Sequence, residues 1–145
     1  MSNQPLIDPL RSLPGYQLRR ISTSTMGDLA RKLASLELRP SEASALVVIA
    51  HNPAVAQSDL GRILGIASGN LVPMIAKLEK RQLVVREQAD GRSLNLRLSS
   101  AGEQLASQAF ATMRTLEATL LQRIPEELQQ GFIAGLAALL EGNDD

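Results

Sequence analysis

The sequence predicts a mainly α-helical fold with one small β-hairpin, and three observations carry that expectation. Apolar residues make up 44% of the 145 positions and aromatic residues 2%, which suits helices packed on helices. Apolar side chains recur at helical spacing along most of the chain. Leu83-Val84-Val85 instead leads into one short strand, and Leu94, Leu96 and Leu98 alternate with polar residues along a second. Asp90-Gly91 between them is typical of a hairpin turn, because glycine adopts a positive φ without penalty.

The composition excludes several kinds of site. There is no cysteine, so disulfides, thiolate metal sites and thiol nucleophiles are excluded. The one histidine, His51, offers no ligand spacing for a metal, and neither a phosphate loop nor paired acids indicate an enzyme. No apolar run approaches the ~20 residues of a membrane span, and the N-terminus lacks the layout of a signal peptide. We therefore expect a cytoplasmic protein without metal, cofactor or membrane partner.

The charges are unevenly distributed although they sum to zero. Residues 1–53 carry +2, residues 54–99 carry +3 and residues 100–145 carry −5. A basic middle with an acidic tail favours an anionic partner at the middle of the chain. An excess of three charges does not by itself distinguish this pattern from chance.

Two helices are predicted in the first third of the chain. Apolar residues at helical spacing indicate a helix from Gly15 to Leu36, preceded by a loose, proline-containing arm. Pro40 fits the first position of a second helix, SEASALVVIAH, which ends before Asn52-Pro53. Because this second helix is apolar nearly all round, we expect it to be central and buried.

Two short helices follow in close succession. QSDLGRILG places its apolar residues on one face, and Gly65 is expected to end it. Ser68 begins the next helix, within IASGNLVPMIAKLEKRQL. Pro73 is expected near the first turn of that helix, where a missing N–H costs less than further in.

Beyond the hairpin, two longer helices are predicted. Ser99 or Ser100 begins a helix that runs to about Arg123, with a capping box between Ser100 and Glu103. Pro125 opens the last helix. A lobe this small cannot cover both apolar stripes, so we expect them to form an isologous dimer interface. The alternative is that they fold back onto their own lobe.

Helix, tight turn, helix and hairpin is the order of a winged helix-turn-helix, whose second helix enters the DNA major groove. The chain resembles the MarR family of bacterial transcriptional regulators in the run QSDLGRILGIASGNLVPMIAKLEKRQLV, in the wing Asp90-Gly91-Arg92 and in LRLSSAGEQL. Gln82 departs from the glycine that many members have after the recognition helix. The resemblance implies a homodimer with intertwined N- and C-terminal helices. Residues 38–99 would then form the DNA-binding lobe, and residues 14–37 with 100–141 the dimerisation region.

The same resemblance implies contacts with double-stranded DNA. An arginine at the tip of the wing, Arg92, suits a narrow and negative minor groove, and Asp90 can orient its guanidinium. Asn70 suits an adenine edge, and Lys77 suits a phosphate. The predicted DNA-contacting residues are Ser58, Arg62, Ser68, Gly69, Asn70, Pro73, Lys77, Asp90, Gly91, Arg92 and Ser93.

Two of these predictions have open alternatives. Ser68 either contacts DNA or serves only as a helix cap. Arg62 either meets a phosphate or pairs with Asp59 or Asp90.

Family members often hold a small aromatic acid between the dimer helices and the winged lobe. An arginine beside hydroxyls and a methionine suits a phenolic carboxylate. The run Gly15-Tyr16 with Arg19-Arg20 resembles the branch that senses phenylpropanoid acids or their CoA thioesters. The predicted ligand-contacting residues are Tyr16, Arg19, Ser22, Thr23, Met26 and His51. For His51, a purely structural role is the alternative.

The sequence therefore predicts a dimeric DNA-binding regulator, acting as a repressor that a small ligand releases from a palindromic operator. The alternative function is a winged-helix module that binds proteins without sequence-specific DNA binding. The net charge of zero is a mild argument for that alternative.

Overall fold

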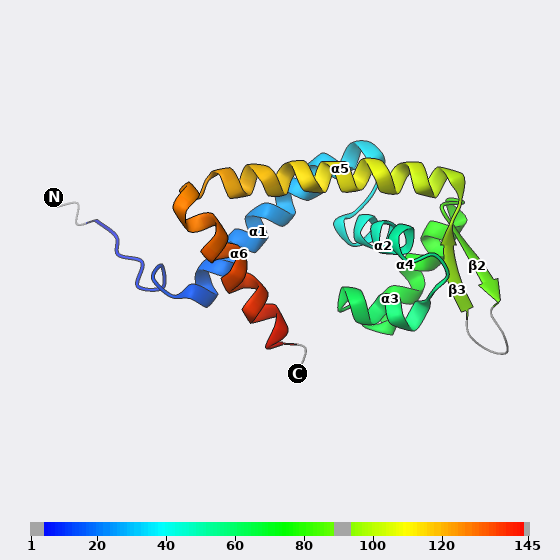
Figure 1. The fold of residues 1–145 in the computed structure, drawn as a ribbon, viewed down its shortest axis with the longest axis horizontal. Helices are drawn as coiled ribbons and strands as arrows, with labels where there is room; N and C mark the ends of the chain where they lie inside the picture. Colours follow the sequence, from blue (N-terminus) through cyan, green and yellow to red (C-terminus); the bar gives the residue numbers. More distant parts are fainter. Residues whose placement is uncertain (1–4, 89–93, 144–145) are drawn as a thin grey trace.

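The computed structural model describes residues 5–88 and 94–143, in which one long helix carries a helical region at one end and a winged lobe at the other (Figure 1). The mainly α-helical fold with a small sheet is thereby confirmed. The helices are α1 (Pro14–Leu33), η1 (Ala34–Leu36, a 3₁₀ turn), α2 (Pro40–His51), α3 (Gln57–Leu64), α4 (Ser68–Lys80), α5 (Ser100–Gln122) and α6 (Glu126–Glu141), and the strands are β1 (Val55–Ala56), β2 (Val84–Gln88) and β3 (Leu94–Leu98).

Helix α2 forms the centre of the winged lobe, as its apolar composition predicts. Leu46 and Ile49 are at most 1% exposed and belong to one core cluster with Leu60 of α3, Ile75 of α4 and Leu96 of β3. Burying each of these side chains contributes about 1.5–3 kcal/mol. The core therefore lies under the helix-turn-helix and holds it against the sheet.

The tight turn between α3 and α4 is closed by Gly65. Its φ of 64° is left-handed, and the N–H of Ile66 donates to the carbonyl of Gly61 at 2.9 Å. Helix α4 begins at Ser68, as predicted. Pro73 lies just beyond the first turn of α4, close to where it was predicted. Its side chain is exposed, so the proline ring faces outward from the lobe.

The wing belongs to a three-stranded antiparallel sheet with the order β1-β3-β2. Strands β2 and β3 form the predicted hairpin, with Val84 opposite Leu98. Leu96 is fully buried on the face of β3 that packs on the lobe. The two-residue strand β1 was not predicted. It forms because Val55 pairs with Leu96 on the free edge of β3.

Ser99 joins the wing to α5. Its hydroxyl donates to the carbonyl of Gln82 at 2.6 Å and accepts from the N–H of Gly102 at 3.0 Å, so Ser99 is the N-cap. Of the two serines that the sequence offered, Ser99 is therefore the cap, and the predicted capping box between Ser100 and Glu103 is wrong. The same hydroxyl braces the turn at Gln82, whose φ of 60° is a left-handed conformation that glycine adopts more easily.

The helical region at the far end of α5 leaves its apolar side chains exposed. Helix α6 has no buried residue, and Leu128, Leu139 and Leu140 are 57–67% exposed. Helix α1 buries only Leu33. The amide of Gln129 donates to two carbonyls at the α5–α6 junction at 3.0 and 3.1 Å, which fixes the direction of α6. Helix α6 thus lies beside α1 and does not fold back onto the winged lobe (Figure 1).

Candidate nucleic-acid interface and ligand cavity

The outer surface of α3 and α4 carries the predicted DNA-contacting residues that the structure describes. Ser68, Gly69 and Asn70 are exposed in the first turn of α4, Pro73 follows one turn later, and Ser58 is exposed on α3. A methyl group placed on Gly69 would meet no atom within 4 Å. No atom of the described chain therefore covers this turn of α4, and a partner can approach it.

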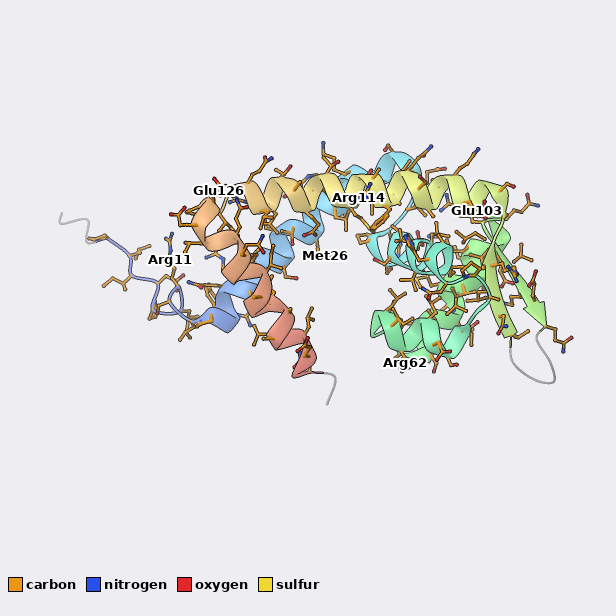
Figure 2. The ribbon with its side chains drawn as sticks, viewed as in Figure 1. Arg11, Met26, Arg62, Glu103, Arg114 and Glu126 are labelled. Carbon is orange, nitrogen blue, oxygen red and sulfur yellow. The ribbon has the colours of Figure 1, made fainter. Side chains whose placement is uncertain are left out.

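The geometry bears on two alternatives that the sequence left open. The N-cap of α4 is Ala67, which makes no side-chain cap bond, so the hypothesis that Ser68 only caps the helix is wrong. Arg62 pairs with Asp59 one turn away at 2.9 Å, and both side chains are more than half exposed. An exposed pair of this kind is worth at most about 1 kcal/mol, so the guanidinium remains able to leave it for a phosphate. Arg62 lies on the opposite side of the chain from Arg114 of α5 (Figure 2).

Lys77 has a partner that the sequence did not reveal. Its ammonium donates to Glu42 Oε1 at 2.6 Å, while the backbone N–H of Arg39 donates to Glu42 Oε2 at 2.9 Å. The Glu42 side chain is 4% exposed. Burial alone would raise the pKa of Glu42, but the hydrogen bonds from Arg39 and Lys77 and their positive charges outweigh it. The pKa therefore lies below its ordinary value of 4.5.

We expect Glu42 to make the unfolding free energy of the protein depend on pH in the acidic range. A carboxylate with a lowered pKa contributes stability that is present above the unfolded-state pKa and is lost as pH falls through the folded-state pKa. Glu42→Gln should therefore cost about 1–2 kcal/mol in unfolding free energy near pH 7, and this cost should shrink as the pH falls below 4.5. Urea denaturation at several pH values measures the difference, with Glu103→Gln on α5 as the control. A cost that stays constant from neutral pH to about pH 3 would contradict the assignment.

Four predicted DNA-contacting residues at the tip of the wing lie outside the residues that the structure describes: Asp90, Gly91, Arg92 and Ser93. They stay predictions. The structure does describe the hairpin below them, whose last pair joins Gln88 to Leu94.

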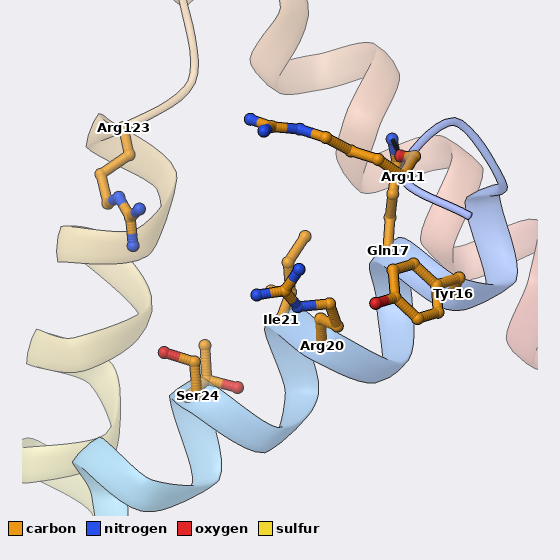
Figure 3. A pocket seen from close by; sticks show the side chains of 8 residues that line it. Arg11, Tyr16, Gln17, Arg20, Ile21, Ser24 and Arg123 are labelled. Carbon is orange, nitrogen blue, oxygen red and sulfur yellow. Dashed lines mark hydrogen bonds between the residues drawn. The ribbon is translucent and has the colours of Figure 1, made fainter. Parts of the chain in front are cut away.

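A cavity of about 530 Å³ opens between α1 and the end of α5 (Figure 3). Three arginines reach it from separate elements: Arg11 from the N-terminal arm, Arg20 from α1 and Arg123 from the cap of α5. The guanidinium groups of Arg19 and Arg20 lie 5.3 and 5.8 Å from the ring centre of Tyr16. The nearest ion-pair partner is Asp8, at 3.9 Å from Arg20. The lining residues are Arg11, Tyr16, Gln17, Arg20, Ile21, Ser24, Thr25 and Arg123, so this lining is cationic and contains no carboxylate.

The predicted ligand-contacting residues are only partly brought together. Tyr16 lines the cationic cavity, and Arg19 and Thr23 line an adjoining hollow. Met26 lines a smaller cavity of about 110 Å³ against α5. Ser22 is exposed on α1 and contributes to none of these three hollows. Sequence reasoning missed Arg11 and Arg123, because nothing local connects residues so far apart in the chain.

His51 does not join this group. Its Nδ1 donates to the carbonyl of Val47 at 2.8 Å, and its ring meets the ring of Phe110 of α5 edge-on at 5.3 Å. This arrangement favours the structural role, in which His51 packs α2 against α5.

Two other kinds of site find no support in residues 5–88 and 94–143. In these ranges no helix is both long and apolar enough to cross a bilayer. No group of three histidine, aspartate or glutamate side chains there is placed to hold a metal ion.

The chain is similar to transcriptional repressors of known sequence and structure. The model of the MarR family matches residues 36–93. The HTH-type transcriptional repressor Rv2887 of Mycobacterium tuberculosis is 28% identical over 120 residues, which cover 81% of this chain and 86% of the relative. The transcriptional repressor CouR bound to a 23-mer DNA duplex has a similar structure, with a TM-score of 0.85 and 28% identity over 94% of this chain and 99% of that chain. CouR bound to p-coumaroyl-CoA gives a TM-score of 0.83 and 26% identity over 94% and 98% of the two chains.

Proposed function

This chain belongs to the MarR family of winged helix-turn-helix transcriptional regulators, and we propose that it is a dimeric repressor that a small anionic aromatic ligand releases from a palindromic operator. The observation that carries the proposal is the exposed N-terminal turn of α4. It projects from a buried core beside a wing, in a fold that matches a DNA-bound repressor over nearly its whole length. Such a helix fits the major groove, and the wing reaches the adjacent backbone or minor groove.

The exposed apolar face of α6 supports the dimer. In the single chain Leu128 and Leu139, which lie on one stripe of α6, are 57% and 59% exposed, and no residue of α6 is buried. An apolar face this large on a water-soluble protein marks an association surface. A twofold axis through this region would place two winged lobes on one duplex, with half-sites roughly 34–36 Å apart.

The wing arginine is expected to carry a large part of the affinity for DNA. Arg92→Ala should weaken binding to DNA from the promoter region of the protein's own gene by on the order of 10- to 100-fold, because each dimer loses two groove contacts. The plot of log affinity against log salt should also become shallower by roughly 1–2. Fluorescence anisotropy with labelled duplex measures both quantities.

The matched control is Arg114→Ala on α5, which removes an arginine on the side of the molecule opposite Arg62 of α3 (Figure 2) and should leave DNA binding unchanged. A wild-type protein that stays dimeric yet binds no duplex at low salt would overturn the proposal. That result would favour the protein-interaction module instead.

The cationic cavity between α1 and α5 is our proposed site for the effector. Arg11, Arg20 and Arg123 offer charge-assisted hydrogen bonds to an anion, and Tyr16 offers an aromatic face beside them. A carboxylate or the phosphates of a CoA thioester suit this lining. The p-coumaroyl-CoA bound by CouR is therefore the first compound to test.

We expect p-coumaroyl-CoA to raise the melting temperature of the protein. A ligand at about 100 times its Kd stabilises the folded state by about 2.7 kcal/mol, which corresponds to a rise of several degrees. Arg20→Gln should reduce this shift, while Arg31→Gln, on the same helix but outside the cavity, should preserve it. Differential scanning fluorimetry with p-coumarate, p-coumaroyl-CoA and CoA alone separates the acid from the thioester. No shift with any of the three would remove this class of effector.

A further inference from the structure

We propose that Lys77 positions the recognition helix through Glu42, and that the neighbouring Arg39 is the cation that meets the DNA backbone at this groove. The inference rests on the proposed DNA binding and refines it, because it reverses the role that spacing along the helix predicts for Lys77. The site is the groove of about 540 Å³ between the N-terminus of α2 and α4. It is lined by Arg39, Ser41, Glu42, Ile66, Asn70, Pro73, Met74 and Lys77.

Both carboxylate oxygens of Glu42 accept hydrogen bonds from within the lobe. Oε2 accepts from the N–H of Arg39 at the start of α2, and Oε1 accepts from Lys77, 35 residues further along the chain. The Glu42 side chain is only 4% exposed, although the Lys77 side chain is 50% exposed, so few water molecules can reach the carboxylate in place of Lys77. If Lys77 moved to a phosphate, a buried carboxylate would lose the only ion-pair partner it has among the described residues and would keep only the charge of Arg39 nearby, which is costly.

The Glu42–Lys77 pair links α4, the proposed recognition helix, to α2 at the centre of the lobe. Asn70, Pro73 and Lys77 recur at helical spacing on one stripe of α4 and line the same groove. A second tether lies beyond the helix, where the guanidinium of Arg81 donates to the carbonyl of Glu37 at 2.7 Å. Together these two links fix the tilt of α4 against α2 and hence where Asn70 points.

The groove between α2 and α4 owes its net positive charge to one residue. The Glu42–Lys77 pair is neutral as a whole, so it adds no net charge to the groove. Arg39 is exposed at the rim and, within the part of the chain that the structure describes, forms no ion pair through its guanidinium. Arg39 therefore supplies the net positive charge of the groove, next to the exposed hydroxyl of Ser41. A planar, always charged guanidinium at this rim suits a phosphate of the strand that flanks α4.

The salt dependence of DNA affinity tests the inference, because it counts phosphate contacts. Anisotropy titrations from about 0.05 to 0.3 M salt compare the wild type with Arg39→Met, Lys77→Met, Glu42→Gln and the double variant of Lys77 and Glu42. Arg39→Met should make the slope shallower by roughly 2 per dimer, one phosphate being lost from each protomer. Lys77→Met and Glu42→Gln should each weaken binding by a similar factor at every salt concentration, with the wild-type slope. The double variant should be no weaker than either single variant, because both act through one contact.

The conservative variant Lys77→Arg keeps a donor for Glu42 and should therefore keep the affinity and the salt slope of the wild type. It remains available for measurement if Lys77→Met fails to fold. Lys32→Met on α1 controls for the loss of one lysine charge. A slope that becomes shallower by roughly 2 in Lys77→Met would show that Lys77 itself meets phosphate, and an unchanged slope in Arg39→Met would remove the role of Arg39. Either result would overturn the inference while leaving the proposed function intact, whereas a wild-type protein that binds no DNA would overturn the proposed function.

Discussion

Gly102→Ala is expected to destabilise the protein by about 3 kcal/mol or more, the largest effect that we anticipate for the addition of a single methyl group. A Cβ at this position would lie 2.1 Å from the carbonyl oxygen of Leu83 and 3.3 Å from Leu98. The carbonyl cannot move aside, because it accepts the backbone N–H of Ser99 at 3.0 Å in the joint between wing and α5. Relief therefore requires the start of α5 to shift away from the sheet, which disturbs both the cap and the hairpin.

Thermal unfolding followed by circular dichroism measures this effect, and the loss corresponds to a fall of roughly 10 °C in melting temperature. The matched control is Gly69→Ala, also in the first turn of a helix, where the new methyl group meets nothing within 4 Å. That variant should be unchanged or more stable by up to about 1 kcal/mol, since alanine favours helix more than glycine does. Equal stability of the Gly69 and Gly102 variants would mean that α5 does not approach Leu83 as closely as described.

Placing two lysines on α6 is expected to abolish the dimer and with it most of the affinity for DNA. In Leu128→Lys/Leu139→Lys, two ammonium groups replace side chains that are 57% and 59% exposed in the single chain and would be buried against a partner. The isolated protomer should still fold, because α6 contributes no buried residue. Two linked lobes bind a palindrome 10²–10⁴ times more tightly than separate lobes, so affinity should fall by a factor of that order.

Light scattering after gel filtration gives the mass, and anisotropy gives the affinity. Gln130→Lys is the control, since it adds a lysine to the same helix on the side away from Leu128 and should leave the dimer intact. A double variant that remains dimeric and binds duplex normally would place the dimer interface elsewhere on the chain.

Much of the winged lobe follows from local sequence signals. Helix α2 is buried because its residues are apolar nearly all round, and that pattern needs no knowledge of its neighbours. The turn at Gly65 follows from a residue that tolerates a positive φ, and the pairing of β2 with β3 was expected from the turn-forming residues that separate them in the sequence. The alternation of Leu94, Leu96 and Leu98 places the second strand of the hairpin. Each of these signals lies within about one turn of helix or one pair of strands.

The details of the joints depend on contacts that no local pattern reveals. Strand β1 consists of two residues and exists because β3 offers it a free edge. Ser99, and not its neighbour Ser100, caps α5 because the carbonyl of Gln82 lies within reach of its hydroxyl. Spacing alone allowed either serine.

The sequence by itself determined the order of elements, the buried helix, the turn residues and the resemblance to a family of DNA-binding regulators, because those depend on residue type and period along the chain. Only the tertiary structure decided the partners of the charged groups. Lys77 meets Glu42 across 35 residues, and Arg11, Arg20 and Arg123 converge on one cavity from three elements. The physical reason is that the energy of a charge is set by its burial and by its nearest counter-charge, and both are fixed by packing between segments that are distant in the chain.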